Sequence, residues 1–180
     1  MNTRAIKRVE ELGDVVGGAT PSTKNPAFWN GDIPWISPKD LTGYRSRYIA
    51  CGSKSITNEG YASASVKMLP TGSVLFSSRA PIGYVAIASC PVCTNQGFKS
   101  VVPNDKIDSL FLYYLLKANA DKIAALGSGT TFKEVSGATM KSVELEVPED
   151  IDEQRAIARI LGTVDEKIEL NDQLNGYLAA

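Results

Sequence analysis

The segment from Gly17 to Leu41 constrains the fold most, because it combines turn-forming residues with large side chains that need burial. Gly17-Gly18 and Asn30-Gly31 favour turns, whereas Trp29 and Trp35 are too apolar to lie free in a loop. Aromatic residues of this kind pin a loop to a core and leave its Thr, Ser, Lys and Asn side chains exposed. The segment therefore has the composition of a recognition loop, in which a rigid scaffold presents polar groups.

Composition places the chain among ordinary globular proteins. It has 180 residues, of which 43% are hydrophobic, which suits one domain with an appendage. No apolar run approaches the roughly 18 residues of a membrane span, and residues 1–20 lack the apolar core of a secretory signal. Three cysteines, Cys51, Cys90 and Cys93, do not make a disulfide framework. We therefore expect a cytoplasmic protein with reduced thiols and no membrane partner.

Charge is distributed unevenly along the chain. Residues 1–147 contain 16 Lys and Arg against 12 Asp and Glu, a net charge of +4. Residues 148–180 contain 3 against 8, a net charge of −5. The overall net charge of −1 therefore combines a basic first part with an acidic second part. Any contact with nucleic-acid phosphates is expected in the first part.

Short apolar runs separated by Gly, Pro, Ser and Asn predict irregular β structure. The runs expected to form strands are residues 33–36, 66–69, 74–76, 84–88 and 98–102.

Three further elements are predicted within residues 1–147. Apolar residues at roughly helical spacing predict a short entry helix within residues 4–16. Asp108 is expected to cap a helix that ends at Gly127. Alternation of apolar residues with Glu over residues 143–147 predicts a half-buried strand with a charged outer face.

Residues 148–180 are predicted to form one long helix. Pro148 ends the preceding strand, and Asp150 with Glu153 has the spacing of a capping box. Apolar residues recur about every seven positions and form a stripe about 40 Å long on one side of the helix. Asn171 is polar and would fix the register if the stripe paired with a second helix. The residues of the stripe are Ile157, Ile160, Leu161, Val164, Ile168, Asn171, Leu174 and Leu178. We expect the stripe to pair with a second copy; the alternative is that it packs on its own domain.

Three clusters of residues resemble parts of catalytic or metal sites, but each lacks something that such a site needs. Zinc bound at Cys90-Pro-Val-Cys93 would need two more ligands, but the chain has no His and only Cys51 besides. Asn25-Pro-Ala-Phe lacks the second Pro of the adenine methyltransferase tetrapeptide, and no glycine-rich turn would cradle a cofactor. Asp165-Glu166-Lys167 imitates a nuclease motif but falls on the outer face of the helix. We therefore expect no catalytic residue, metal or cofactor.

Polar chemistry suited to DNA remains. Forked donors read base edges, whereas Lys, Ser, Thr and backbone N–H groups hold phosphates. The DNA-binding candidates are Lys39, Arg45, Arg47, Tyr48, Lys54, Arg79, Lys99, Thr130, Thr131 and Lys133. Since most Lys and Arg side chains are merely solvated, about a third of these are expected to touch DNA.

Five segments, in this order, resemble target recognition domains in the DNA specificity subunits of Type I restriction-modification systems. They are residues 17–41, 75–85 (LFSSRAPIGYV), 94–99 (TNQGFK), 127–133 (GSGTTFK) and 153–158 (EQRAIA). The resemblance implies an α+β fold, in which an irregular β-rich target recognition domain with a packed helix precedes one long coiled-coil-type helix.

The same resemblance implies a function and partners. Such a subunit is not an enzyme; it binds double-stranded DNA and directs methylation (M) subunits, and through them the restriction (R) subunit, to a bipartite target. The partners would bring S-adenosylmethionine and ATP hydrolysis. Residues 95–98 match a motif shared by subunits of different specificity, so we expect them to shape a loop. Residues 42–67 match no pattern of the family, so readout is expected there, by Arg45, Arg47, Tyr48 and Lys54.

The chain departs from the family in its length. A full-size member holds two recognition domains in tandem, each followed by a long helix, and the helices pair antiparallel. This chain has one domain, residues 1–147, and one helix, residues 148–180. It is either a natural half-length subunit that forms a homodimer or a piece of a longer protein. Two rival functions also stay open: a recognition module detached from a methyltransferase or nuclease, and a protein-interaction module with a dimerising helix.

Overall fold

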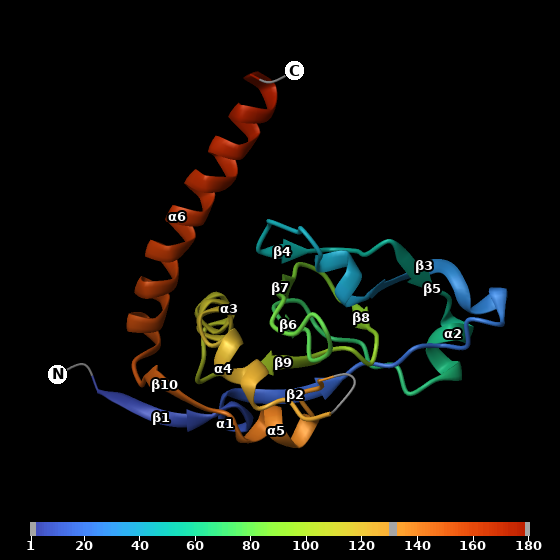
Figure 1. The fold of residues 1–180 in the computed structure, drawn as a ribbon, viewed down its shortest axis with the longest axis horizontal. Helices are drawn as coiled ribbons and strands as arrows, with labels where there is room; N and C mark the ends of the chain where they lie inside the picture. The colour runs from blue at the N-terminus through green and yellow to red at the C-terminus, as the bar shows by residue number, and fades with distance from the viewer. Residues whose placement is uncertain (1–2, 130–132, 179–180) are drawn as a thin grey trace.

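A computed structural model describes residues 3–129 and 133–178, the last two of these by backbone alone. A long helix, α6 (Ile151–Leu178), projects from a β-rich domain, and α3 (Ser109–Ala118) lies between this helix and the central sheet (Figure 1). The fold is therefore the predicted α+β arrangement with a long C-terminal helix.

The strands form three sheets. The central sheet has the order β2-β9-β6-β7-β4, antiparallel except for the pair β4 and β7. Its strands are β2 (Gly13–Gly17), β4 (Tyr48–Ile49), β6 (Val74–Phe76), β7 (Val85–Ala88) and β9 (Lys99–Pro103). A second sheet joins β5 (Lys54–Ile56), β3 (Trp29–Ile36) and β8 (Cys93–Thr94). A two-stranded ribbon pairs β1 (Arg4–Arg8) with β10 (Glu144–Pro148).

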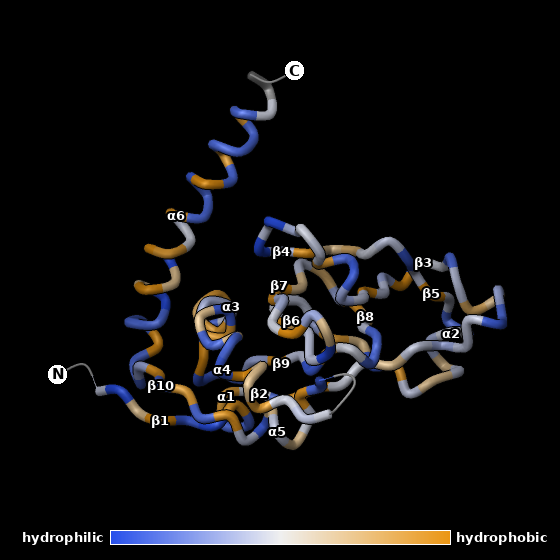
Figure 2. Tube along the Cα trace, viewed as in Figure 1, coloured by the Kyte–Doolittle hydropathy of each residue, from blue (hydrophilic) through white to orange (hydrophobic). Residues whose placement is uncertain are grey.

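Short helices connect the strands. The remaining α-helices are α1 (Val9–Leu12), α2 (Asn58–Ser63), α4 (Ala120–Ala125) and α5 (Gly137–Ser142), and two 3-10 helices are η1 (Pro26–Phe28) and η2 (Pro38–Leu41). The largest core lies between α3 and the central sheet, where Phe76, Leu112 and Leu116 are fully buried. Apolar segments accordingly gather around α3, β6 and β9 in Figure 2.

Most of the predicted strands are present, but two predictions from local spacing are wrong. Residues 66–69 form no strand; Leu69 makes only an isolated bridge to Val92. The expected entry helix is instead β1, α1 and β2. Pairing of β1 with β10 and of β2 with β9 satisfies the backbone there, so long-range hydrogen bonds override the helical spacing.

The two helix predictions hold, with one break. The side chain of Asp108 accepts a hydrogen bond from the N–H of Phe111 at 2.9 Å, which caps α3 as expected. Asn119 then separates α3 from α4, because its side-chain amide donates to the carbonyl of Leu115. At the start of α6, Asp150 accepts from the N–H of Asp152 at 2.9 Å.

The segment with two tryptophans is pinned as its composition predicts. The indole N–H of Trp35 donates to the carbonyl of Ala19 at 3.0 Å, and that of Trp29 donates to Ser22 at 3.2 Å. The two rings meet edge to face with centroids 5.1 Å apart. Both rings pack beside the buried Ile56 in a small apolar cluster. The turn expected at Asn30-Gly31 is instead an irregularity within β3, whose register shifts between Trp29 and Ile33.

The neighbouring glycines Gly17 and Gly18 offer a matched test of this packing. A Cβ at Gly18 would lie 2.1 Å from the carbonyl oxygen of Asn95, whereas one at Gly17 would meet only the Lys99 side chain, at 3.9 Å. We expect Gly18→Ala to lower the free energy of unfolding by about 1–3 kcal/mol. Gly17→Ala should change it far less. Urea unfolding of both variants checks this, and equal effects would contradict it.

Candidate nucleic-acid interface

A groove of about 350 Å³ brings together segments that are far apart in the sequence. We call it the basic groove. It is lined by Ser37, Pro38, Lys39, Thr42, Arg79, Ala80, Pro81, Asn95, Gln96 and Gly97. Two of the predicted DNA-binding residues, Lys39 and Arg79, therefore share one surface with an exposed amide, Gln96.

The Lys39 side of the groove is fixed by Asp40. Its carboxylate accepts hydrogen bonds from the backbone N–H and the hydroxyl of Ser37 at 2.8 and 2.7 Å, and from the N–H of Ser53 at 2.8 Å. Partial burial acts to raise the pKa of Asp40, but the hydrogen bonds from Ser53 and Ser37 outweigh it and hold the pKa below its ordinary value. An ionised Asp40 thus ties η2, with the exposed Lys39, to the loop before β5.

The Arg79 side is the loop between β6 and β7. Buried Ser77 donates its hydroxyl proton to the carbonyl of Pro81 at 2.8 Å and accepts from the N–H of Tyr84 at 2.8 Å. Buried Ser78 donates its N–H to the carbonyl of Gly97 at 2.7 Å. The two serines hold the loop, and Arg79 follows as an exposed residue.

The turn at residues 95–97 closes the groove. Asn95 accepts from the N–H of Gly97 at 2.9 Å, so its amide shapes the turn as the sequence suggests. The hydroxyl of Thr20 is bonded to Gln96, which links the turn to the segment after Gly18. Gln96 was expected only to shape the loop, yet the structure places it at the exposed lip beside Arg79.

Glu134 joins two of the predicted DNA-binding residues. Its carboxylate lies 2.9 Å from Nε of Arg79 and 3.2 Å from Nζ of Lys99. Desolvation acts to raise the pKa of Glu134, but the hydrogen bonds from Arg79 and Lys99 prevail and hold the pKa below its usual value. Sequence reasoning missed Glu134, because its partners lie 55 and 35 positions away and give no local signal.

Two further candidates, Lys54 and Lys133, do not line the groove. Lys54 is exposed on β5, with Nζ 5.2 Å from the centre of the Trp29 ring. Lys133 is also exposed. Thr130 and Thr131 lie outside the residues that the structure describes.

The structure buries Arg47, one of the two residues expected to read bases, whereas 77% of the side chain of Arg45 is exposed. The side chain of Arg47 is only 9% exposed and contacts Glu166 of α6 at 3.1 Å. Arg45 forms an ion pair with Asp172 of the same helix. Tyr48 stays half exposed, and the guanidinium of Arg47 lies 5.9 Å from its ring centre. These cations face acidic residues of α6, because residues 45–47 run beside that helix.

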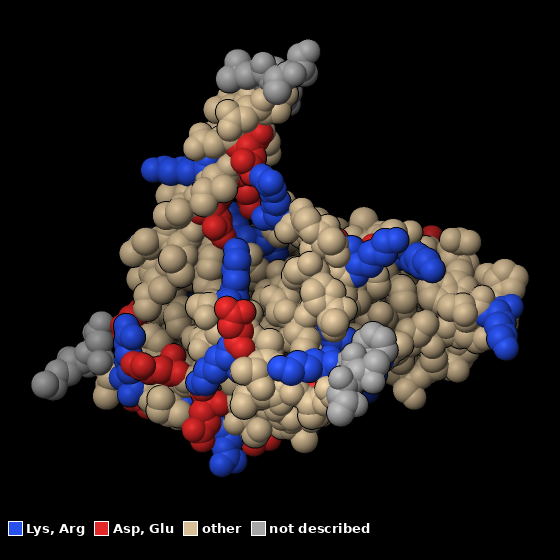
Figure 3. Space-filling model, in the orientation of Figure 1, with Lys and Arg blue, Asp and Glu red and all other residues tan. Residues whose placement is uncertain are grey.

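A cavity of about 470 Å³ between the domain and α6 is a poor site for DNA. Carboxylates of Asp165, Glu169 and Asp172 line it, and they would repel phosphates. Charges in Figure 3 follow the same division: basic side chains along α6 and at its foot lie beside acidic ones, whereas those over β3 and β5 have few acidic neighbours. The basic groove is therefore the better candidate.

The predicted seam of α6 is largely exposed. Ile160, Leu161, Val164, Ile168 and Leu174 are between 40% and 65% exposed, and Asn171 is exposed as well. Ile157 is an exception, since it packs against the core of its own domain. The side chain of Leu178 lies outside the described residues. The alternative expectation, that the stripe packs on its own domain, is therefore wrong for the five exposed apolar residues. It is right for Ile157.

Burial differs among the three cysteines: Cys51 is exposed, Cys90 is partly buried and Cys93 is buried. Cys93 is fully buried beside Trp35, and burial raises the pKa of its thiol to about 11. Within residues 3–129 and 133–178, no group of three or more His, Cys, Asp or Glu could hold a metal ion. In the same part of the chain, no helix is long and apolar enough to cross a membrane.

Comparison with known proteins shows which family the chain resembles. The family model described as "Type I restriction modification DNA specificity domain" matches residues 2–178. The chain is 43% identical over 175 residues to the Type I restriction enzyme MjaIX specificity subunit of Methanocaldococcus jannaschii, covering 96% of this chain and 40% of that protein. It is 32% identical over 167 residues to the EcoR124I/EcoR124II specificity subunit of Escherichia coli, covering 88% and 40%.

A solved structure shows the same fold. The S subunit of a Type I restriction-modification system from M. genitalium superposes with a TM-score of 0.70 at 20% identity, covering 96% of this chain and 42% of that chain. The chain spans about 40% of the length of the curated relatives named above.

Titration of Glu134 tests the geometry of its ion pairs. Because its pKa is lowered on folding, the pairs stabilise the fold above the pKa of the unfolded chain, and this contribution is lost as pH falls through the folded pKa. Carboxyl NMR should therefore show Glu134 titrating below an ordinary glutamate, and Arg79→Gln should move its midpoint upward. Lys106→Gln, at an exposed position elsewhere, should not. A midpoint at or above the ordinary value in the unaltered chain would contradict the arrangement.

Proposed function

Because the chain belongs to the family of Type I restriction-modification DNA specificity domains, we propose that it binds double-stranded DNA and lends sequence selectivity to separate methylation and restriction subunits. The observation that carries this proposal is the basic groove, in which Lys39 and Arg79 converge on one exposed surface. Residues 1–147 act as the target recognition domain and residues 148–180 as the spacer helix. The chain selects the site and leaves catalysis to its partners in the cytoplasm.

Readout of bases falls to the basic groove rather than to the segment beside α6. Arg79 offers a forked donor suited to a guanine edge, and Gln96 offers an amide suited to adenine. Lys39, Lys54, Lys99 and Lys133 supply charge for phosphates. Arg79 and Lys99 already face a carboxylate, so binding DNA requires them to exchange Glu134 for DNA or to bind while still paired with it.

Substitutions in the groove test this assignment on duplexes that the unaltered chain selects from a random pool. Arg79→Ala should weaken binding by about 1–3 kcal/mol and relax preference at one base pair. Lys39→Ala should weaken all sequences alike and flatten the dependence of affinity on salt. Lys106→Ala, outside the groove, is the control and should change neither property. If the unaltered chain selects no sequence, the proposed function is wrong; if it does and Arg79→Ala keeps every preference, the location is wrong.

The exposed stripe of α6 serves in pairing with a second long helix. In a homodimer, this contact restores a two-domain arrangement, and an antiparallel twofold axis places Val164 and Ile168 near their own equivalents. Such a dimer would bind an inverted repeat with a nonspecific gap. The support for pairing is that five apolar side chains of the stripe lie at least 40% exposed along one side of the helix.

Charge placed in the stripe tests the dimer. Val164→Lys with Ile168→Lys would bury like charges in the seam, so sedimentation should show monomers with a folded domain and weak DNA binding. Thr163→Lys with Gln173→Lys adds the same charge at exposed positions off the stripe and should leave association unchanged. An unaltered chain that stays monomeric at micromolar concentration, or a target that is not an inverted repeat, would exclude the homodimer.

A further inference from the structure

Arg47 is unusual among the cations of this protein. Within residues 3–129 and 133–178 it is the one Lys or Arg that is buried, with 7% of the residue exposed. Its Nη1 donates to the carbonyl of Gly162 at 3.3 Å, and its Nη2 donates to Glu166 at 3.1 Å. Both acceptors belong to α6, so a cation of the recognition domain is enclosed against the long helix.

Gly162 makes this contact possible. A Cβ at residue 162 would lie 2.8 Å from Nη1 of Arg47, so a side chain there would displace the guanidinium. Burial acts to lower the pKa of Arg47, but the hydrogen bond to Glu166 outweighs it and the pKa is raised. Arg47 is therefore charged, and withdrawal of its carboxylates would leave an unpaired buried cation.

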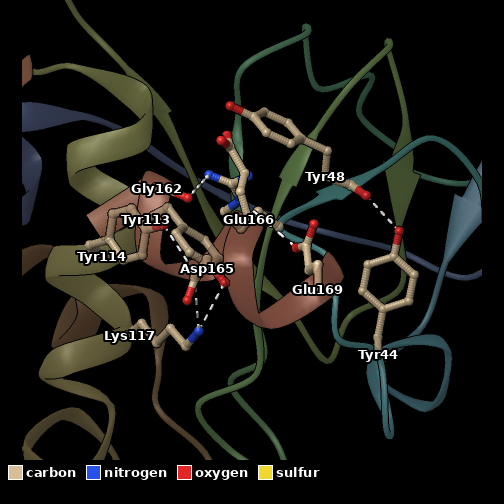
Figure 4. Close-up of polar contacts among 10 residues, drawn as sticks. Tyr44, Tyr48, Tyr113, Tyr114, Lys117, Gly162, Asp165, Glu166 and Glu169 are labelled. Atoms are coloured by element: carbon tan, nitrogen blue, oxygen red, sulfur yellow. Dashed lines mark hydrogen bonds and ion pairs between the residues drawn. The ribbon is translucent and has the colours of Figure 1, made fainter. Parts of the chain in front are cut away.

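Further contacts hold successive turns of α6. Tyr114 of α3 donates to Asp165 at 2.9 Å, and Lys117 lies 4.0 Å from the same carboxylate. Figure 4 shows both side chains reaching Asp165, which is followed by Glu166 and, one turn further along α6, by Glu169. We call Arg45, Arg47, Tyr114 and Lys117 the helix-anchoring cluster. Its partners extend along α6 from Gly162 to Asp172.

The character of the contact changes along the helix. At its foot, Ala158 is buried in the apolar core and the buried amide of Gln154 bonds Asp108, Lys106 and Pro148. Beyond Gly162, polar contacts replace apolar packing, and the cavity of about 470 Å³ separates α6 from the domain. The direction of this distal part therefore depends on the anchoring contacts.

A small change of direction has a large consequence for DNA. From Gly162 to Leu178 the helix extends about 24 Å, so a tilt of about 10° moves its end by about 4 Å. This displacement is comparable to the 3.4 Å step between base pairs along one strand. In a two-domain assembly, the tilt of each spacer helix sets the separation of the recognition domains.

We propose that Arg47 is a positioning residue that fixes the direction of α6 relative to the recognition domain and thereby sets the gap length between the two parts of a bipartite DNA target. This inference rests on the proposed function for its effect on DNA, but the positioning itself does not. A fork that binds Gly162 and Glu166 at once fixes both the rotation and the tilt of the helix, which a point charge does not.

Residual dipolar couplings of the full 180-residue chain measure the angle between α3 and α6 directly. Arg47→Met keeps much of the side-chain volume but removes the fork, so the couplings of α6 should change or shrink while those of the domain persist. Arg47→Lys should restore the angle only in part. Arg155→Met makes the same change at an exposed ion pair with Asp152 within α6, and it should leave the couplings as they are. If Arg47→Met fails to fold, Glu166→Gln with Glu169→Gln removes the partner charges instead and should have the same effect.

Gap preference provides the functional readout. Affinity is measured for duplexes that the unaltered chain selects and for the same duplexes with the gap lengthened or shortened by one base pair. Arg47→Met should lower the preference for the original gap length about tenfold, which corresponds to about 1.4 kcal/mol. Preference for the bases themselves should persist. An unchanged angle would overturn the positioning role whether or not the chain binds DNA. A changed angle with unchanged gap preference would overturn the link to spacing, whereas absence of DNA binding by the unaltered chain would refute the proposed function alone.

Discussion

Backbone groups in long loops need partners, and the way they are satisfied determines most of this structure. Strands of two to five residues leave much of the chain without a ladder, except for the longer β3. Buried or half-buried side chains supply the missing partners: Asp40 for residues 37 and 53, Ser77 for residues 81 and 84, and Asn95 for residue 97. Asn95 lines the basic groove itself, and Asp40 and Ser77 form hydrogen bonds with residues 37 and 81, which line it. The side chains that hold the loops therefore position the exposed Lys39, Arg79 and Gln96 for contact with a ligand.

Two different faces of α6 serve two purposes: one packs on the domain of the same chain, and the other carries the exposed apolar stripe. At 100° per residue, the face of the helix with Ile160, Val164 and Ile168 is centred about 120° from the face with Gln154, Ala158 and Gly162. One side of α6 therefore attaches to its own domain while another stays free. This separation explains why a seven-residue repeat in the sequence does not predict the intramolecular contacts. The contacting side consists of small and polar residues, which a search for apolar periodicity passes over.

Local signals in the sequence predicted elements well where local energetics decide them. Asp108, Pro148 and the alternation over residues 143–147 each act within a few positions, and the structure has the expected cap, break and strand. The entry segment was mistaken because its strands are stabilised by partners about 90 to 140 positions away. The site shows the same limit. Asn95 acts on its own turn and could be foreseen, whereas the pairing of Arg47 with Glu166 spans 119 positions and could not.

The uneven distribution of charge along the chain is explained by the ion pairs of α6 and by those near the basic groove. The acidic part of the chain is not merely solvated, because Asp165, Glu166, Glu169 and Asp172 face cations of the domain. Those pairs enclose Arg47 against α6, tie the exposed Arg45 to the same helix and direct it. Basic residues nearer the groove either stay exposed, as Lys39 does, or share Glu134, as Arg79 and Lys99 do. Glu134 keeps two cations close together without a ligand, since the carboxylate offsets their mutual repulsion. A phosphate could take over that role at little cost in reorganisation, so the arrangement favours a polyanion that arrives at the groove over one that approaches α6.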